Sequence, residues 1–416
     1  MYKLLFLVSL LFVLSNAKTA QAYSAASALV ADVNSGYLFT KENIDVPLHP
    51  ASLTKVMTLY LTFSALEEGL LKMDDALPIS EWAAAQEPSK LDLVAGETIT
   101  VREAILALIV KSANDVAVVL AETLAPTEAI FADMMTQAAA QLGMSRTVFK
   151  NASGLHHPDQ LTCAQDMAIL TLATIKNFPQ YYPLFATQSF TYKGREYNTH
   201  NHILTDYEGA EGFKTGYIAA AGYNIISTAN KENHRLVSIV LGHSSAKERD
   251  DYAKSLLDFG FEKIQKQKNA LQQGLLQPAF DPLQRKAMVG KLNMNVFTPM
   301  MKMRTKQVLA QAKKAKQTAQ SIHNTMHQIT FTQNPDYMWT IQIGAFGTQE
   351  KALSMANKAM SVLNINQCAV QIQKKDNQLY RSRLTGFQTK QMAEAACDTL
   401  NNNHHACFVV IPQGDK

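Results

Sequence analysis

The chain has 416 residues, of which 47% are hydrophobic and 18% charged, so it has ample material for a core and more length than one domain usually takes. This composition excludes an intrinsically disordered polymer. The formal net charge of +4 is small and gives no indication of a nucleic-acid partner, and we expect none.

The N-terminus predicts a secretory signal peptide over residues 1–22. Lys3 supplies a basic start, Leu4 to Leu14 form an apolar segment, and Ala20-Gln21-Ala22 is a small-x-small cleavage site. The apolar segment is too short to span a bilayer. We therefore expect export and a mature chain that begins near Tyr23, with an uncleaved anchor as the alternative.

The next region, 23–265, predicts one enzyme-sized domain. A hairpin pattern begins at Ser27, helical patterns dominate from about Leu53 to Lys176, and strand patterns return over 211–243 before a closing helix. Strands at both ends with helices between them indicate a single sheet built from both ends of the domain. The expected fold class is α/β or α+β.

Residues 266–336 differ in composition from what precedes them. Lysine and arginine are frequent, and Asp281 is the only acidic residue between 266 and 333. We interpret this segment as a basic linker that is helical in part. It is either a solvated spacer or a candidate for peripheral contact with an anionic membrane surface.

A compact pattern returns over 337–413. Strand and helix patterns alternate in the order βαββαβ, beginning with "WTIQIGAF" and ending with "ACFVVIP". This order is typical of a small ferredoxin-like module.

The chain has four cysteines, and three of them fall in this last region: Cys368, Cys397 and Cys407. An oxidising compartment permits a disulfide there, and three pairings are open. We favour Cys397–Cys407, which would join a helix to the following strand. No Cys/His spacing typical of a metal site is present, so the sequence gives no indication of a metal. The family resemblance described below implies no organic cofactor either.

The sequence "HPASLTKVMT" places Ser52 and Lys55 three residues apart where an apolar helix begins. At this spacing both side chains lie on one face of the helix. Burial lowers the pKa of a lysine, and a neutral amine can accept a proton from a serine hydroxyl. The signal is weak alone, because Ser244 and Lys247 repeat it.

Two further motifs accompany the first pair. Ser112 and Asn114 follow an apolar helix, where a hydroxyl could relay a proton and a carboxamide could hold a substrate amide. Lys214, Thr215 and Gly216 lie on a predicted strand. Their side chains could bind a carboxylate, and glycine permits close approach of a substrate. Each motif has an ordinary structural reading, but the ordered triple is specific.

The triple resembles the serine penicillin-binding proteins and β-lactamases. The surrounding text, including "KSANDVAV", "NASGLHHPDQL" and "EGFKTGYIAAAGYN", is similar to low-molecular-mass D-alanyl-D-alanine carboxypeptidases. The resemblance implies a β-lactamase/transpeptidase-like domain with an antiparallel sheet, flanking helices and a helical block. It also implies a periplasmic enzyme that removes the terminal D-alanine from peptidoglycan stem peptides and is inhibited by β-lactams.

Carried over by position, the resemblance makes Ser52 the acylated nucleophile, Lys55 its base and Ser112 the proton relay. The oxyanion hole would be the backbone N–H groups of Ser52 and Tyr217. The residues that orient the peptide or hold its carboxylate would be Asn114, Lys214, Thr215, Gly216 and Arg249.

Two alternatives remain for the function. A serine β-lactamase would share the acylation chemistry, although the Glu-x-x-Leu-Asn motif of one lactamase class does not follow Ser112. A non-catalytic protein that binds septal peptidoglycan would keep only the fold of the first domain. The β-rich domain and amphipathic anchor that follow the catalytic domain in well-known carboxypeptidases are not visible in this sequence.

The last region resembles the SPOR domain, whose members bind septal peptidoglycan. "WTIQIGAFGTQEKA" and "LYRSRLTGF" carry this resemblance. Strand alternation directs Gln342, Arg381 and Arg383 to the sheet face away from the helices. They are candidates for contact with glycan strands, or simply a solvated sheet face.

Overall fold

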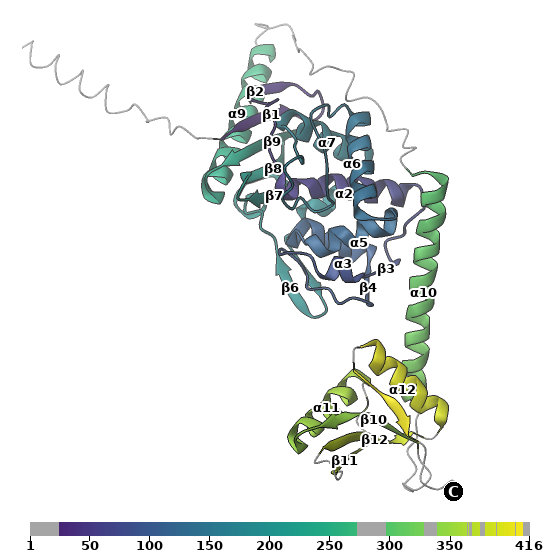
Figure 1. Ribbon diagram of the computed structural model, residues 1–416. Helices are drawn as coiled ribbons and strands as arrows, with labels where there is room; N and C mark the ends of the chain where they lie inside the picture. The colour runs from purple at the N-terminus through teal and green to yellow at the C-terminus, as the bar shows by residue number, and fades with distance from the viewer. Residues whose placement is uncertain are drawn as a thin grey trace, which may run out of the picture. The chain divides into compact units, whose positions relative to one another are not determined.

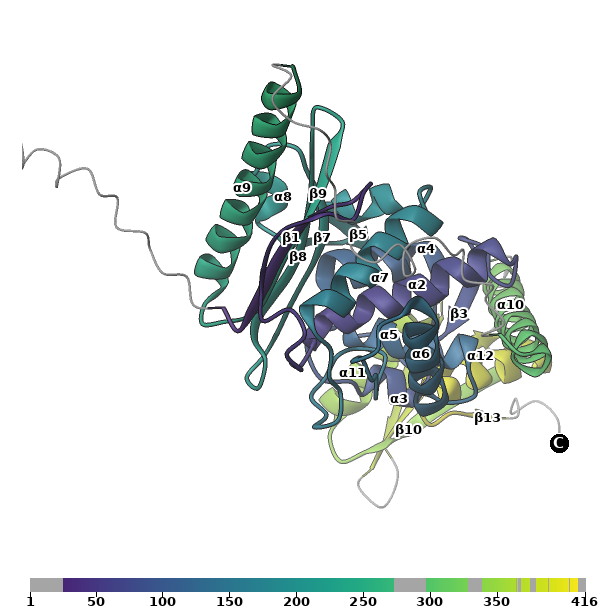
Figure 2. The ribbon, with the colours of Figure 1, turned by 90° about the horizontal axis from the view of Figure 1, so that it is seen from above.

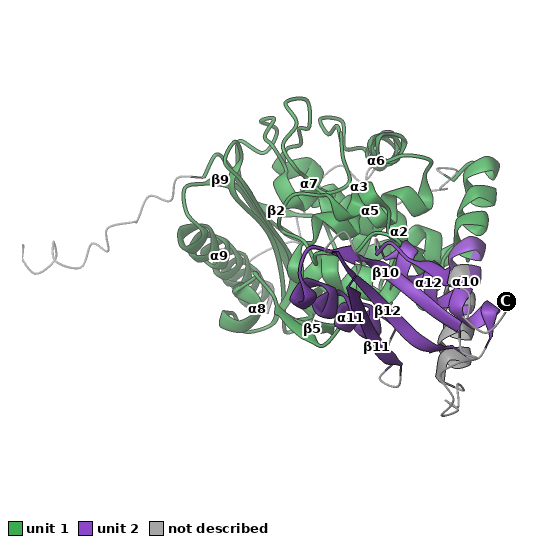
Figure 3. Ribbon diagram, turned by 60° about the horizontal axis from the view of Figure 1, so that its bottom comes forward, with its two compact units in different colours: residues 1–309 green, residues 310–416 purple. Residues whose placement is uncertain are grey.

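The computed structural model describes residues 25–272, 297–327 and 339–410, with short gaps at 364, 366–367, 375–378, 388 and 404 (Figure 1). The predicted signal peptide lies outside the described residues. The chain divides into two compact units, 1–309 and 310–416, which Figure 3 colours separately.

The first unit contains a five-stranded antiparallel sheet with the strand order β2-β1-β9-β8-β7. Two strands come from the start of the domain and three from its end, so the predicted assembly from both ends is confirmed. The strands are β1 (Ser27–Asp32), β2 (Leu38–Glu42), β7 (Ala210–Ile218), β8 (Gly222–Lys231) and β9 (His234–His243).

Helices cover both faces of this sheet (Figure 2). The closing helix α9 (Ala246–Gln272) packs on one face, against residues such as Val30 and Val240. Their neighbours in sequence, Leu29 and Ile239, point to the helical block on the other face. Strand alternation therefore explains why β1 and β9 are buried along most of their length.

Helix α2 (Thr54–Glu67) runs through the centre of the helical block, and every residue from Thr54 to Ala65 is buried. A helix that is buried all round needs no polar face. Around it lie α5 (Asn114–Leu124), α6 (Glu128–Leu142) and α7 (Ala164–Asn177). This arrangement carries Lys55 into the interior of the domain.

Shorter elements connect these parts. They are η1 (Ala51–Leu53), β3 (Ala76–Pro78), α3 (Glu81–Ala84), β4 (Thr98–Thr100), α4 (Val101–Leu106), η2 (Ala107–Lys111), η3 (Tyr182–Ala186), β5 (Ser189–Tyr192), β6 (Arg195–Asn198) and α8 (Ile203–Asp206).

The predicted linker is helical where the structure describes it. Helix α9 continues to Gln272, and α10 spans Pro299–His327. The start of this second segment packs on the first unit: Phe297 is buried in the main core, and the Thr305 hydroxyl donates to Thr123 O at 3.2 Å. Residues 297–309 thus belong with the first unit. None of the helices in the described part of the chain combines the length and the hydrophobicity of a membrane span.

The second unit has the predicted βαββαβ order. Its four-stranded antiparallel sheet, β11-β12-β10-β13, packs against two helices. The elements are β10 (Trp339–Phe346), α11 (Gln349–Leu363), β11 (Ala369–Lys374), β12 (Tyr380–Phe387), α12 (Lys390–Asn402) and β13 (Phe408–Val410).

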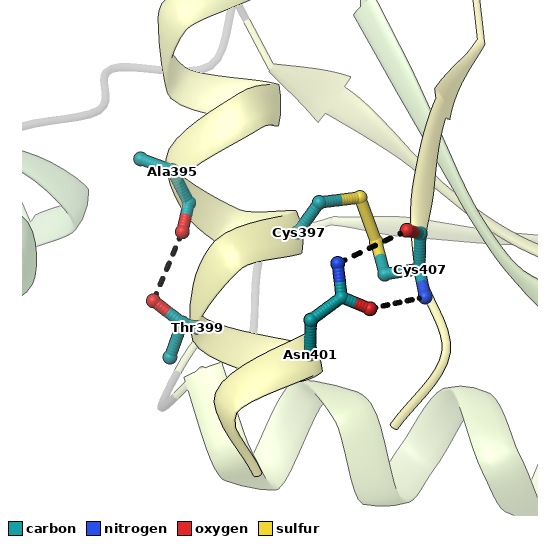
Figure 4. The surroundings of a disulfide bond; sticks show 5 residues. All are labelled: Ala395, Cys397, Thr399, Asn401 and Cys407. Carbon is teal, nitrogen blue, oxygen red and sulfur yellow. Dashed lines mark hydrogen bonds between the residues drawn. A yellow bond between two sulfur atoms is a disulfide. The ribbon is translucent and has the colours of Figure 1, made fainter. Parts of the chain in front are cut away.

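A disulfide joins Cys397 on α12 to Cys407, which confirms the favoured pairing (Figure 4). Asn401 supports the same connection, because its side chain accepts from Cys407 N at 2.9 Å and donates to Cys407 O at 3.3 Å. Cys163 and Cys368 are buried free thiols. Closing a loop with a sequence separation of 10 stabilises a fold by about 3 kcal/mol in the chain-entropy account.

Candidate active site

Ser52 and Lys55 lie on one face of the start of α2, as their spacing predicts. Ser52 is part of the 3-10 turn η1, which continues directly into the helix. The Lys55 side chain is fully buried, and its Nζ lies 3.1 Å from Ser52 Oγ.

Two further contacts orient the Lys55 amine. Lys55 Nζ donates to Asn114 Oδ1 at 2.7 Å and to the backbone carbonyl of Ser153 at 2.5 Å. Both oxygens can only accept hydrogen bonds. When the amine is neutral, its two hydrogens go to these oxygens, and its lone pair therefore faces Ser52 Oγ. This is the geometry that a base for the serine hydroxyl requires.

Electrostatics keep the Lys55 amine able to accept a proton. Burial lowers the pKa of Lys55 well below its ordinary value, and the nearby Lys214 charge lowers it further. The carboxylate of Asp115 acts in the opposite direction. Asp115 is itself buried and accepts from the backbone N–H groups of Leu91, at 3.0 Å, and Leu93, at 3.2 Å.

Ser112 sits at a sharp change of backbone direction. The π-helical turn η2 ends there, and Ser112 adopts a left-handed conformation with φ of 60° before α5 begins at Asn114. Its buried hydroxyl has no hydrogen-bond partner within the described residues. A left-handed serine is uncommon and is a reason to look for function.

Asn114 is engaged at both ends of its carboxamide. Its Nδ2 donates to Glu87 O at 2.9 Å, which fixes the orientation in which Oδ1 faces Lys55. The sequence suggested that this carboxamide holds a substrate amide. In the structure it positions the Lys55 amine and ties α5 to the loop that contains Glu87.

Strand β7 passes directly beside Ser52. A Cβ at Gly216 would lie 2.9 Å from Ser52 N, so only glycine fits without a shift. Lys214 is buried, and its Nζ donates to Thr215 O at 2.8 Å. Burial, together with the Arg249 charge, lowers the pKa of Lys214 to about 7.

A cleft of about 350 Å³ opens above these groups. Seven of the predicted site residues line it: Ser52, Ser112, Asn114, Thr215, Gly216, Tyr217 and Arg249. Lys55 and Lys214 lie behind this lining. The Arg249 guanidinium is held by Asp250, with Nη2 2.7 Å from Asp250 Oδ1.

Other residues that line the cleft were not predicted. They include Ser89, Leu155, His200, His202 and Tyr223. The lining described here contains no Asp or Glu, so the cleft suits an anionic ligand. Ser153 was missed because it contributes only a backbone carbonyl, which no side-chain motif reveals.

The second Ser-x-x-Lys pair is held by surface carboxylates. Ser244 donates to Glu248 Oε2 at 2.8 Å, and Lys247 pairs with Asp251 at 2.6 Å. The Lys247 side chain is 85% exposed. Among the described residues, no group of His, Cys, Asp and Glu could hold a metal ion.

In the second unit, the structure brings Gln342 and Arg383 together across strands β10 and β12. Arg383 Nε donates to Gln342 Oε1 at 3.1 Å. Burial and the neighbouring charge of Arg381 lower the pKa of Arg383. Ser382 and Leu384, which alternate with these arginines, are buried toward the helices, as strand alternation predicts.

Two known families match this chain, one over each part. The D-alanyl-D-alanine carboxypeptidase family, peptidase S11, matches residues 14–245, more than half of the chain. The chain belongs to this family. The SPOR domain matches residues 335–411, which cover the second unit's sheet and helices.

Curated members of the carboxypeptidase family are similar over the first unit. D-alanyl-D-alanine carboxypeptidase DacF of Bacillus subtilis is 35% identical over 245 residues, which are 58% of this chain and 63% of the relative. DacC of Escherichia coli is 32% identical and covers 58% of this chain. The chain thus spans less than two thirds of the length of these relatives.

Solved structures of the carboxypeptidase family agree with the fold. Penicillin-binding protein 5 of Haemophilus influenzae is 33% identical, with a TM-score of 0.57 over 59% of this chain and 72% of that one. Penicillin-binding protein D2 of Listeria monocytogenes, solved in its ampicillin-bound form, is 31% identical with a TM-score of 0.52 over 58% of this chain and 99% of that one.

Proposed function

We propose that this protein is an exported serine D-alanyl-D-alanine carboxypeptidase that acts on peptidoglycan stem peptides through an acyl-Ser52 intermediate. The observation that carries the proposal is the arrangement at Lys55. A buried amine has two pure acceptors, Asn114 Oδ1 and Ser153 O, and therefore directs its lone pair at Ser52 Oγ.

In the first half-reaction, Ser52 Oγ attacks the carbonyl of the penultimate D-alanine, and its proton passes to Lys55 Nζ. The oxyanion is stabilised by the backbone N–H groups of Ser52 and Tyr217, where β7 lies against the nucleophile. The C–N bond then breaks. Ser112, whose hydroxyl has no partner in the described part of the chain, relays the proton to the leaving amine of D-alanine.

In the second half-reaction, water attacks the acyl-Ser52 ester, and Ser52 regains its proton as the shortened stem peptide leaves. The terminal carboxylate of the substrate is held by Thr215 together with the charges of Lys214 and Arg249. The absence of acidic side chains from the described cleft lining supports this assignment. A β-lactam that mimics D-Ala-D-Ala would acylate the same serine.

The SPOR domain would raise the local concentration of the enzyme at peptidoglycan. Arg381 and Arg383 are the side chains proposed to contact glycan strands directly. Gln342 is only 6% exposed, so its proposed contribution to this surface is through its hydrogen bond with Arg383. The signal peptide, 1–22, would direct the chain to the periplasm, with enrichment at the division septum. The basic segment 266–336 would add peripheral contact with an anionic membrane surface.

The proposal is tested by release of free D-alanine from a pentapeptide that ends in D-Ala-D-Ala. The mature protein should release D-alanine, penicillin should block the release, and Ser52→Ala should be inactive. Rapid turnover of penicillin without D-alanine release would favour a β-lactamase. Neither activity, with retained peptidoglycan binding, would favour a non-catalytic wall-binding protein.

A further inference from the structure

The catalytic amine depends on a carbonyl in an irregular loop. Ser153, whose carbonyl accepts from Lys55 Nζ, lies between α6 and α7 in a segment without regular secondary structure. The neighbouring residues Ala152 and Gly154 are buried as well. A Cβ at Gly154 would lie 1.9 Å from Ala51 O and 3.0 Å from Ser52 N, so this loop presses directly on the nucleophile's backbone.

Two side chains hold Ala152, the residue before Ser153. The Thr58 hydroxyl, one turn after Lys55 on α2, donates to Ala152 O at 2.7 Å. On the other side, Ala152 N donates to Glu128 Oε1 at 3.0 Å. These contacts fix the backbone on the Ala152 side of Ser153. On the other side, Gly154 N donates to Asn151 Oδ1 at 2.7 Å. The Ser153 carbonyl is thus held from both sides, and Glu128 is the acceptor that reaches this loop from α6.

Glu128 is the first residue of α6 and is not among the residues that line the cleft. Its second oxygen, Oε2, accepts from Trp82 Nε1 at 3.1 Å. The carboxylate therefore bridges the indole on α3 and the loop beneath the nucleophile. Hydrogen bonds to an ionised carboxylate are stronger than those to a neutral oxygen.

We propose that Glu128 is a positioning residue for the acylation step: through Ala152 N it holds the Ser153 carbonyl against Lys55 Nζ and so aims the amine's lone pair at Ser52. This inference rests on the proposed function. It assigns a role to a residue that touches neither the substrate nor the reacting atoms.

Loss of the Glu128 carboxylate leaves the buried Ala152 N–H without its acceptor, which the loop can relieve only by moving. Movement of Ser153 O has two consequences for Lys55. The lone pair is less well aimed, which lowers the plateau rate of acylation. The ammonium form loses an acceptor, which lowers the pKa of Lys55, so the acid limb of the rate profile moves to lower pH.

Other groups that face Lys55 stay unchanged in this experiment. Lys214 on β7 and Asp115 on α5 are the charged groups that act on it, and Ser52 and Asn114 are its neutral partners. None of them contacts Glu128 in the described hydrogen bonds. A shift of the acid limb on substitution of Glu128 therefore reports on the Ser153 carbonyl.

The test compares Glu128→Ala with the parent, using the full mature chain and the second-order rate of penicillin acylation from pH 5 to 9. We expect the plateau of Glu128→Ala to fall by about tenfold or more, since small misplacements of reacting groups are costly. We expect its acid limb to move to lower pH. Hydrogen exchange measured by mass spectrometry should rise over residues 150–156.

Two variants separate positioning from general destabilisation. Glu128→Gln keeps an acceptor for Ala152 N–H but sets its amide against the Trp82 indole N–H, so it should be slow. Adding Trp82→Phe removes that conflict and should restore the plateau to within about threefold. Glu122→Gln is the matched control. Glu122 lies on α5, and its Oε2 accepts at 2.6 Å from Ser80 Oγ, the residue that caps the start of α3. No described hydrogen bond joins Glu122 to Ala152, so this variant should behave as the parent.

A folded Glu128→Ala protein with the parent's plateau, acid limb and exchange would overturn the inference. A second result would also overturn it. In that case Glu128→Ala is slow, but its acid limb and its hydrogen exchange over residues 150–156 match the parent, and the double variant Glu128→Gln/Trp82→Phe is no faster than Glu128→Gln. If the parent itself is not acylated, the proposed function fails, and the exchange comparison still decides whether Glu128 holds the loop.

Discussion

Ser52–Lys55 and Ser244–Lys247 have the same spacing, and each pair lies at the start of a helix, α2 for the first and α9 for the second. Their surroundings differ completely. Lys55 is fully buried and donates to neutral oxygens, whereas the Lys247 side chain is 85% exposed and pairs with Asp251.

This difference decides which lysine can act as a base. Burial without a directly paired carboxylate lowers the pKa of Lys55, whereas Lys247 is exposed and pairs with the carboxylate of Asp251. Spacing places a lysine beside a serine, but only the fold supplies the environment that changes its chemistry.

The largest expected effect is that of removing the buried amine. Lys55→Ala should lower the rate of penicillin acylation by about 10³-fold, within the range of general base catalysis. Stopped-flow measurement with a fluorescent penicillin would check this. If Lys55→Ala is acylated at a rate within tenfold of the parent, burial of Lys55 does not make it the base, and the contrast with Lys247 fails.

Asp115→Asn tests how the buried carboxylate of Asp115 affects the stability of the fold and the pKa of Lys55. Its carboxylate accepts from Leu91, Leu93 and Val116 backbone N–H groups, and an amide would set a donor against them. We expect a loss of about 2 kcal/mol in the free energy of unfolding by urea titration. Because the Asp115 charge raises the pKa of Lys55, its removal should also move the acid limb of acylation to lower pH. An unchanged acid limb would contradict this coupling.

We expect Lys214 to cause a fall in activity at alkaline pH. Its pKa is lowered to about 7, so its charge is present below that pH and is lost above it. Binding of a substrate carboxylate should weaken accordingly, and kcat/KM for D-alanine release should fall by about tenfold from pH 7 to 9. Lys214→Gln should be slow at all pH values and lack this limb. An alkaline limb that persists in Lys214→Gln would assign it to another group.

The smallest effect is expected at the exposed pair. Ser244→Ala and Lys247→Ala should leave acylation within about twofold and the melting temperature within about 2 °C, as is usual for surface residues. Differential scanning fluorimetry and the acylation assay check both. A large loss of acylation from either would mean that the cleft is organised differently.

Much of the site could be predicted because its chemistry resides in side chains at fixed spacings. The motifs in the sequence identify Ser52, Lys55 and Ser112 in this way. They also identify Gly216, where a Cβ would lie 2.9 Å from Ser52 N. The assembly of one sheet from both ends also followed from alternating apolar strands. Backbone groups carry no such signal, so the Ser153 carbonyl could not be predicted.

Contacts between residues far apart in the chain could not be predicted from the sequence either. Nothing in the composition of the basic segment indicates that Phe297 enters the core of the first unit, or that the Thr305 hydroxyl reaches Thr123 O. The contacts of Asn114 show the same limit. Its partner Glu87 lies 27 residues away, and the carboxamide is oriented by that contact.

The measurement that tests the central claim most directly is intact-mass spectrometry of the mature protein during brief exposure to penicillin, with Ser52→Ala and Ser244→Ala measured beside it. The account predicts a long-lived adduct on the parent and on Ser244→Ala, and none on Ser52→Ala. An adduct that survives in Ser52→Ala, or disappears in Ser244→Ala, would contradict it.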